Sequence, residues 1–271
     1  MSMEAVGCIG CGRMGGALLS GWAMHARGAC VLCGFNRSPG PMADLVAKGI
    51  RAMPDAVSLV RECRIVIVAV KPHQVEEVLG SVRDALTADK VVVSVAAGVT
   101  LEQLGDAVGG RCAVARCMPN TPALVGQGVF ALCLDRVPSQ DDRSELVALF
   151  GRLGMSLVLP EGRFAAFSAL MGAGPAYVFA MMQGLVQAGV TLGFPHAQSR
   201  AMVTALFQGA SAMAAESSAP LHQMRDDVCS PGGLTIAGVN HLDRCGLTGI
   251  LVDAVLAADA KGRAMEAPTG R

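Results

Sequence analysis

Short apolar runs alternate with helix-length segments over the first 160 residues. Each run is apolar throughout rather than at every second position, so we expect strands buried on both faces by covering helices, as in a parallel sheet. The predicted strands are Val6–Ile9, Cys30–Phe35, Ile65–Val70, Val91–Val95 and Cys112–Cys117, with Val129–Leu134 and Ser156–Leu159 as candidate extensions of the sheet. The predicted helices between them are Gly15–Ala26, Pro41–Lys48, Val75–Leu86 and Leu101–Val108.

The pattern changes near Glu161, after which Ala, Gly and Met dominate and only helical periodicity is found. The chain is therefore predicted to hold an α/β domain with a doubly wound, mostly parallel sheet over residues 1–160. An all-helical domain is predicted over residues 161–271. Its expected helices are Arg163–Ala169, Pro175–Leu192, Pro195–Ala214, Gly233–Arg244 and Thr248–Arg263.

Composition narrows the class of protein. Among 271 residues, 22 basic and 22 acidic side chains cancel, and charged residues make up only 16% while apolar residues make up 52%. An average soluble protein has about 25% charged residues. This balance argues against disorder and gives no electrostatic reason to expect nucleic acid as a partner. It also leaves few charges to cover a monomer of this length.

A membrane would explain the shortage of charge. No Asp, Glu, Lys or Arg occurs between Arg163 and Arg200, and a membrane span needs about 20 apolar residues. However, the run is interrupted by Gly172-Ala-Gly-Pro175, and it carries Gln183 and Gln187 beyond the proline. We therefore expect no membrane partner, and instead a helix buried between subunits.

The ten cysteines and the N-terminal residues bear on the cellular compartment. The first residues lack the basic region of a secretion signal, and the cysteines lie in apolar, strand-like contexts, so buried thiols in a cytoplasmic protein are predicted. Cys8-x2-Cys11 and Cys30-x2-Cys33 have the spacing of a zinc ribbon. Because most of these cysteines fall within predicted strands, no metal is predicted, and structural zinc stays the alternative.

A glycine motif follows the first predicted strand. Gly10-Cys11-Gly12-Arg13-Met14-Gly15 lies between that strand and a predicted helix. In this context glycines allow a tight turn, close approach of the backbone to a pyrophosphate and close helix packing, as in a Rossmann-type domain. The sequence predicts dinucleotide binding by this segment, together with Ile9 before it.

The end of the second strand predicts which dinucleotide binds. The strand is followed by Asn36-Arg37-Ser38, with no acidic residue before Asp44 to bond a ribose 2′-hydroxyl. An arginine between two small polar residues suits a 2′-phosphate. NADPH is therefore the predicted cofactor. NADH, with Arg37 in a solvated turn, is the alternative.

Ligands of doubly wound sheets lie beyond the carboxyl ends of the strands. At these positions we predict further cofactor contacts by Ala69, Val70, Lys71 and Pro72, and by Ala97 and Gly98. After the next strand, Met118-Pro-Asn120-Thr-Pro122 prevents a helix, and it places Asn120 as a candidate substrate-binding residue.

One motif of the helical domain has the character of an anion site. Ser230-Pro231-Gly232-Gly233 precedes a predicted helix that contains Thr235. Backbone N–H groups of such a segment can hold a carboxylate, although an ordinary helix cap is the alternative. Cys229 is a candidate nucleophile, but the sequence places no histidine to activate it.

Five motifs together resemble the pyrroline-5-carboxylate reductase family. They are Gly10-x-Gly12-x-x-Gly15, Ala69-Val-Lys-Pro72, Met118-Pro-Asn-Thr-Pro122, Gly172-x-Gly-Pro-Ala-Tyr-Val-Phe179 and Ser230-Pro-Gly-Gly-x-Thr235, in matching order from Val6 to about Lys261. The resemblance implies reduction of 1-pyrroline-5-carboxylate to L-proline by NAD(P)H, the last step of proline biosynthesis. It also implies a helical domain that forms a homodimer, which assembles into decamers in some members.

The resemblance also implies residue roles. Ser230, Pro231, Gly232 and Gly233 would hold the substrate carboxylate, with Thr235 near the ring nitrogen; Thr235 and Ser230 are the predicted catalytic residues. Three departures stand out, since the family often has Ser at Ala173, Asn near Ala56 and Thr at Leu234.

The related β-hydroxyacid dehydrogenases use a lysine where this chain has Val178, and the absence of that lysine favours reduction of an imine over a carbonyl. Another NADPH-dependent imine or ketone reductase is one alternative. A non-catalytic NADPH-binding or zinc-stabilised interaction protein is the other.

Overall fold

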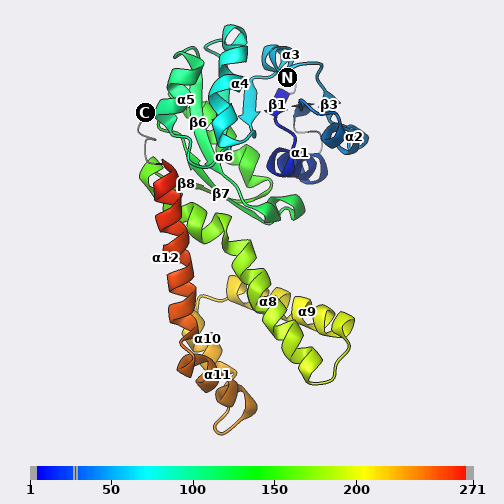
Figure 1. Cartoon of the computed structure of the whole chain (residues 1–271), viewed down its shortest axis with the longest axis vertical. Coiled ribbons are helices and arrows are strands. Elements are labelled where there is room, and N and C mark those ends of the chain that lie inside the picture. The colour runs from blue at the N-terminus through cyan, green and yellow to red at the C-terminus, as the bar shows by residue number, and fades with distance from the viewer. Residues whose placement is uncertain (1–4, 27, 29, 267–271) are drawn as a thin grey trace. The chain divides into compact units, whose positions relative to one another are not determined.

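The computed structural model describes residues 5–26, 28 and 30–266. An eight-stranded sheet has the order β3-β2-β1-β4-β5-β6-β7-β8. All neighbouring strands are parallel except β6 and β7, which confirms the predicted doubly wound, mostly parallel sheet (Figure 1). The strands are β1 (Ala5–Ile9), β2 (Val31–Phe35), β3 (Arg51–Ala52), β4 (Ile65–Val68), β5 (Val91–Ser94), β6 (Ala113–Met118), β7 (Gly128–Cys133) and β8 (Gly154–Val158).

The predicted helices occur in the predicted order, with three further α-helices among them. The α-helices are α1 (Arg13–His25), α2 (Gly40–Ala47), α3 (Ala56–Glu62), α4 (Val75–Val82), α5 (Leu101–Val108), α6 (Gln140–Gly151), α7 (Phe164–Phe167), α8 (Gly174–Thr191), α9 (His196–Glu216), α10 (Leu221–Asp227), α11 (Leu234–Arg244) and α12 (Leu247–Glu266). The sequence did not predict α3, α6, α10 or the two-residue strand β3. In addition, the helix predicted over 75–86 ends as an α-helix at Val82 and continues as a 3₁₀ turn.

Alternating side chains of the strands form two apolar cores, one on each face of the sheet. One face packs against α1, α2 and α6, and the other against α3, α4 and α5. On β4, for example, Ile65 and Ile67 belong to the first core, whereas Val66 and Val68 belong to the second. Burial on both faces explains why the strands are apolar throughout.

Trp22 fixes the helix that follows the glycine motif. Its indole Nε1 donates a hydrogen bond to the carbonyl oxygen of Leu149, 2.9 Å away. Its ring packs edge-on against Phe150, with 5.5 Å between the ring centres. The far end of α1 is thereby tied to α6, which sets the direction in which the first turn of α1 points.

The chain forms two compact units. One comprises the chain up to Ala173 together with the segment from Ala258 onward, called here the sheet unit; the other is Gly174–Ala257, the helical unit. Composition changes near residue 160, but Glu161–Ala173 packs with the sheet. This segment ends in a π-helical turn, Ser168–Gly172.

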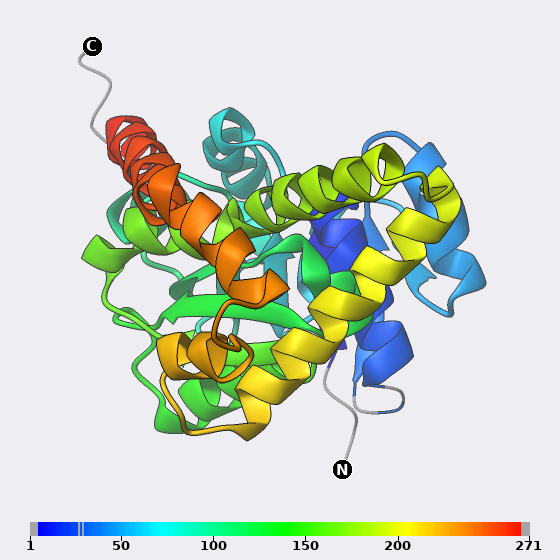
Figure 2. The same ribbon diagram turned by 90° about the horizontal axis from the view of Figure 1, so that it is seen from below.

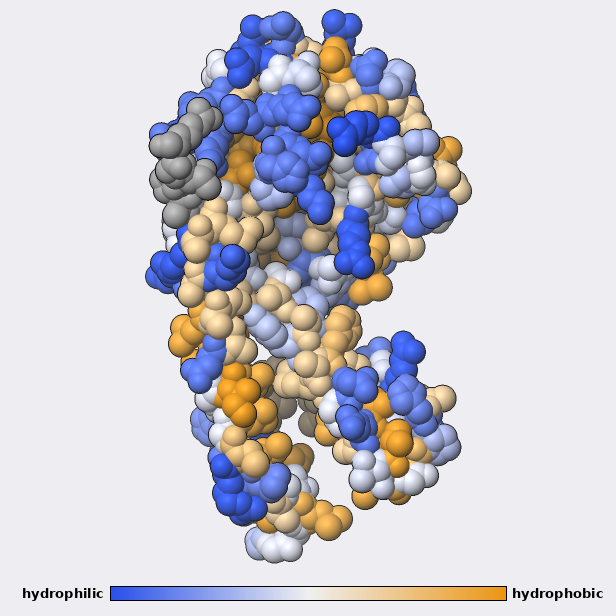
Figure 3. Space-filling model, in the orientation of Figure 1, coloured by the Kyte–Doolittle hydropathy of each residue, from blue (hydrophilic) through white to orange (hydrophobic). Residues whose placement is uncertain are grey.

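The helical unit exposes much apolar surface. Its helices α8 and α9 form a V-shaped hairpin (Figure 2), closed by the contact of Gly189 with Ser199. Large apolar side chains lie at the surface along these helices (Figure 3), among them Phe179 at 65% exposure, Leu192 at 78% and Leu206 at 58%. By length and composition alone, the helical run Glu161–Thr191 could cross a membrane, and 22% of its most apolar stretch is buried within the chain.

Candidate functional site

The three glycines of the first motif have three different surroundings. A Cβ atom on Gly15 would lie 2.1 Å from the carbonyl oxygen of Gly10, so this glycine allows α1 to pack on the turn. Gly10 has a φ of +94°, and a Cβ there would lie 2.8 Å from the backbone of Ala69. A Cβ on Gly12 would meet no atom within 4 Å. The space above Gly12 is therefore open to a ligand.

The first turn of α1 points at this open space. Gly12 is the N-cap residue, no side chain caps the helix, and the first turn contains no acidic residue. Backbone N–H groups of an uncapped first turn lack partners within the helix, and the helix dipole favours negative charge there. The segment fits a pyrophosphate without help from any side chain.

Asn36 joins the glycine turn to the end of β2. Its Oδ1 accepts a hydrogen bond from the backbone N–H of Cys11 at 3.0 Å, and its Nδ2 donates to the carbonyl oxygen of Ser38 at 2.8 Å and to the Ser38 hydroxyl at 2.9 Å. The hydrogen bonds of the Asn36 amide thus hold the turn in shape, and the exposed side chain of Arg37 supplies positive charge beside it.

A groove of about 560 Å³ extends from the glycine turn past these residues. Apolar side chains such as Phe35, Val70 and Val78 suit the faces of a nucleobase, and Arg37 supplies positive charge for a phosphate. Ala56, near which the resemblance leads us to expect Asn, lines the groove without a side-chain group that can form hydrogen bonds. The lining residues are Ile9, Gly10, Phe35, Asn36, Arg37, Ser38, Ala56, Val70, Gln74, Glu77, Val78 and Ser81.

Sequence reasoning missed the contribution of α4 to this groove. Gln74, Glu77, Val78 and Ser81 recur at intervals of three to four residues and so share one face of that helix. The three- to four-residue spacing of these side chains could have predicted a shared face of the helix. However, only the observed packing of α4 beside β4 shows that this face borders the groove rather than solvent.

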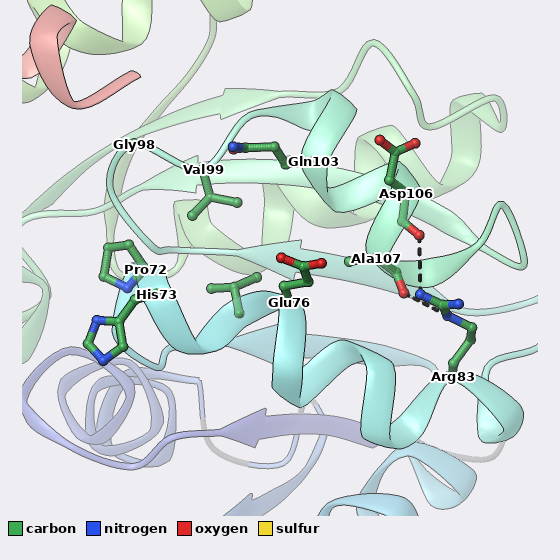
Figure 4. A pocket seen from close by; sticks show the side chains of 10 residues that line it. Pro72, His73, Glu76, Arg83, Gly98, Val99, Gln103, Asp106 and Ala107 are labelled. Atoms are coloured by element: carbon green, nitrogen blue, oxygen red, sulfur yellow. Dashed lines mark hydrogen bonds between the residues drawn. The ribbon is translucent and has the colours of Figure 1, made fainter. Parts of the chain in front are cut away.

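A second hollow, of about 480 Å³, lies between α4 and α5 (Figure 4). Pro72 and His73 enter it from the end of β4, and Gly98 enters it from the end of β5. Among the other lining residues, the Arg83 guanidinium donates hydrogen bonds to the carbonyl oxygens of Ala107 at 2.9 Å and Asp106 at 3.4 Å. Arg83 therefore joins the two helices. Lys71, the residue before Pro72, is exposed beside this hollow.

Ala97 and Gly98 also border a third, smaller hollow of about 230 Å³. It is also lined by small residues of the segment after α7, including Ser168, Ala169 and Ala173, and by residues of α12 from Ala258 to Met265. Gly98 has a φ of +76°, and a Cβ there would lie 3.2 Å from the carbonyl oxygen of Met265. The two predicted cofactor residues at the end of β5 are thus held between two packed segments.

Asn120 is buried, with 5% of its surface exposed. Its Oδ1 accepts a hydrogen bond from the Val129 N–H at 2.9 Å, and its Nδ2 donates to the carbonyl oxygen of Met171 at 3.2 Å. It therefore ties β7 to the π-helical turn. Contact of Asn120 with substrate stays a prediction, because both ends of its amide already serve the fold.

The predicted carboxylate site lies within the helical unit. The turn before α11 closes with a hydrogen bond from the Gly233 N–H to the Ser230 carbonyl oxygen at 3.0 Å, and Gly232 has a φ of +67°. No side chain caps α11, so the N–H groups of its first turn are open to an anion. Leu234 and Thr235 lie in that turn, and Leu234 is 95% exposed.

The four cysteines with zinc-ribbon spacing are divided between the two faces of the sheet. Cys8 and Cys11 belong to the core under α1, whereas Cys33 belongs to the opposite core. A hydrogen bond with Cys11, together with complete burial, raises the pKa of the Cys8 thiol well above its usual range, which disfavours the thiolate a metal needs. Among the described residues no group of three or more His, Cys, Asp or Glu side chains could hold a metal.

Two family models match the chain. A model for pyrroline-5-carboxylate reductase dimerisation matches residues 161–265, and a model for coenzyme F420-dependent NADP oxidoreductases matches residues 5–98. The pyrroline-5-carboxylate reductase of Pisum sativum is 35% identical over 95% of this chain and 94% of its own length. That of Escherichia coli strain K12 is 34% identical over 93% and 94%.

Solved structures agree with these relatives. The Plasmodium falciparum pyrroline carboxylate reductase with NADP bound is 29% identical, with a TM-score of 0.87 over 97% of this chain and all of that one. The enzyme of Coxiella burnetii is 27% identical, with a TM-score of 0.89 over 97% and 99%.

A methyl group at Gly12 tests the phosphate site. In Gly12→Ala the added carbon meets no protein atom but fills the space above the helix start, so we expect an unchanged Tm and NADPH binding weakened at least about tenfold. Quenching of Trp22 fluorescence by NADPH measures the binding.

Two further variants are the controls for Gly12→Ala. Gly40→Ala, which also meets no atom, should alter neither quantity. Gly15→Ala should lower stability by about 1–3 kcal/mol. Unchanged NADPH affinity in Gly12→Ala would contradict the assignment.

Proposed function

This chain belongs to the pyrroline-5-carboxylate reductase family, and we propose that it reduces 1-pyrroline-5-carboxylate to L-proline with a hydride from NADPH. Identity of 35% with a named family member over 95% of the chain supports the family. The observation that carries the cofactor is the uncapped start of α1, which faces open space above Gly12. Arg37, which comes shortly after β2, lines the same groove, and no acidic residue occurs between β2 and Asp44.

The residues present fit the whole dinucleotide. Backbone N–H groups between Gly10 and Gly15 hold the pyrophosphate, Arg37 holds the 2′-phosphate, and the groove along α4 takes the adenosine. Ala97 and Gly98 border the nicotinamide end, because they lie at the carboxyl edge of β5. When bound, NADPH supplies the hydride.

The helical unit supplies the substrate contacts. The uncapped turn Ser230–Gly233 binds the carboxylate, and the Thr235 hydroxyl bonds the ring nitrogen and holds its proton. The imine carbon gains a hydride and the ring nitrogen keeps a proton, which gives the amine of L-proline. A protonated imine carbon is already electrophilic, so the reaction depends more on orientation than on a strong acid. The valine at position 178, where related carbonyl reductases use lysine, agrees with this chemistry.

The proposal includes a homodimer built by the helical unit, which can assemble further into a decamer. The match of residues 161–265 to a dimerisation model supports the dimer. The exposed side chains Phe179, Leu192 and Leu206 also support it. A dimer covers this apolar surface, so the helical run needs no membrane.

We also propose a cytoplasmic location. All ten cysteines are free thiols, and disulfides are rare in the reducing cytosol. Burial raises the pKa of Cys117 well above its usual range and that of Cys112 to about 11, so both thiols stay protonated at neutral pH. Cell fractionation that found the protein outside the cytoplasm would contradict this proposal.

NADPH oxidation measured with 1-pyrroline-5-carboxylate tests the reaction. We expect turnover with this substrate and little with cyclic imines that lack the carboxylate.

Thr235→Ala should lower kcat/KM about ten- to a thousandfold through loss of a hydrogen bond in the transition state. Thr191→Ala, which removes an exposed hydroxyl bonded only to the Gln187 carbonyl oxygen among the described residues, should leave kcat/KM unchanged. No turnover in the unaltered enzyme would reject the function, and full activity of Thr235→Ala would reject that residue's role.

Replacement of Arg37 tests the cofactor preference. Arg37→Ala removes the cation that bonds the 2′-phosphate, so KM for NADPH should rise about ten- to a hundredfold. KM for NADH should not change, because NADH has no such phosphate. Arg51→Ala, which lies outside the groove, is the matched control. Equal effects on both cofactors would mean that Arg37 does not select NADPH.

A charge within the apolar surface tests the dimer. Sedimentation velocity should give at least twice the mass of one chain for the unaltered protein. Leu206→Glu buries an unpaired charge in the proposed interface and should yield monomers at micromolar concentration. Val46→Glu changes a residue on α2 that is 50% exposed, and it should leave the assembly intact. A stable monomer of the unaltered protein would overturn the dimer.

A further inference from the structure

An arginine lies in the interior of the sheet unit. Arg116, in β6, is 1% exposed. Its Nη1 lies 2.8 Å from Glu161 Oε1, and its guanidinium carbon lies 4.6 Å from the centre of the Phe164 ring. A buried cation is costly unless a counter-ion and hydrogen bonds compensate it. Glu161 is therefore held in a defined position by a group that cannot move to water.

The same oxygen of Glu161 also holds the start of α5. Oε1 accepts a hydrogen bond from the backbone N–H of Leu101 at 2.6 Å. Leu101 is the first residue of α5, where a helix has unpaired N–H groups and favours negative charge. Glu161 Oε1 thus accepts two hydrogen bonds, one from Arg116 in β6 and one from Leu101 in α5.

The segment Ala96–Thr100, which joins β5 to α5, is consequently anchored at both ends. At its beginning, the Ala96 N–H donates to the Ser94 hydroxyl at 3.2 Å. At its end, Thr100 and Gln103 exchange hydrogen bonds of 2.9 and 3.2 Å, and Leu101 follows with its bond to Glu161. Ala97 and Gly98, the residues that border the nicotinamide end, lie between these anchors.

Glu161 is also connected to the segment after α7, which lines the hollow beside Ala97 and Gly98. It precedes α7, whose Phe164 packs under the Arg116 guanidinium. The π-helical turn that follows α7 supplies Ser168 and Ala169 to the hollow of about 230 Å³ that Ala97 and Gly98 border. Residues of α12 also line this hollow. The segment at the end of β5 and the segment after α7, which both border it, are therefore linked through one carboxylate.

We propose that Glu161, held by Arg116, is a positioning residue for hydride transfer: it fixes the spacing between Ala97–Gly98 and the turn Ser168–Gly172, and so orients the nicotinamide end of NADPH. The inference rests on the proposed function for its kinetic consequence. The competing account is an ion pair that only stabilises the fold.

Two ligands separate these accounts without turnover. In Glu161→Ala, Kd for NADPH, measured by quenching of Trp22 fluorescence, should rise about tenfold. Kd for 2′,5′-ADP, which lacks the nicotinamide end, should match that of the unaltered protein. A loss confined to NADPH supports the proposal. Equal losses for both ligands, or no loss for either, would overturn it.

Kinetics add a second readout. Glu161→Ala should lower kcat/KM about ten- to a hundredfold and change the isotope effect measured with NADPH deuterated at the transferred position. If the pair only stabilised the fold, Vmax would fall with the folded fraction while KM and the isotope effect stayed constant. If the unaltered enzyme fails to reduce 1-pyrroline-5-carboxylate, the proposed function is rejected, and the two Kd values still decide the role of Glu161.

Two further variants complete the experiment. Glu161→Gln keeps an oxygen that can accept from Leu101 but loses the charge that faces Arg116. It should fold and show the same NADPH-specific loss in smaller degree, so it serves where Glu161→Ala does not fold. Glu62→Ala breaks an ion pair with Arg51 that is more than a third exposed on both sides. It should leave both Kd values and the isotope effect unchanged.

Discussion

The close approach of α1 to the ends of β1 and β4 is the constraint on which the cofactor edge depends. Gly15 lies so near the Gly10 carbonyl, and Gly10 so near Ala69, that neither position has room for a side chain. The Trp22–Leu149 hydrogen bond holds the other end of α1. Packing therefore fixes where the uncapped first turn points, and the proposed phosphate binding depends on the position of its backbone N–H groups.

This dependence on backbone explains which parts were predictable. Glycine spacing between an apolar run and a helix constrains the turn so strongly that the segment Ile9–Gly15 could be predicted from the sequence. Helices α3 and α6 were missed because they show weak apolar periodicity: α3 begins at the Asp55 cap, and α6 is polar in its first turns and buries only Leu146, Leu149 and Phe150. Long-range contacts, such as that of Asn120 with Met171, leave no local pattern to detect.

The composition of the chain changes near Glu161, but the first boundary between the two compact units lies at Ala173. The shortage of charge begins near Glu161, yet Glu161–Ala173 belongs to the sheet unit. Phe164 and Phe167 enter the core under α4 and α5, while small residues nearby line the hollow beside Gly98. The two phenylalanines of this segment thus serve a core, whereas large apolar side chains of α8 and α9 such as Phe179, Leu192 and Leu206 lie at the surface of the chain. Periodicity alone does not distinguish these two uses.

The resemblance to the family leads us to expect Ser at position 173, Asn near position 56 and Thr at position 234, and this chain has other residues there. Ala56, Ala173 and Leu234 have no side-chain group that can form hydrogen bonds. The uncapped starts of α1 and α11 remain, and each offers N–H groups that no substitution at those three positions removes. Since these groups face a pyrophosphate and a carboxylate in the proposed function, the main anion contacts survive the three replacements. In the proposed function, selectivity for cofactor and substrate then depends on side chains, with Arg37 assigned to the 2′-phosphate and Thr235 to the ring nitrogen.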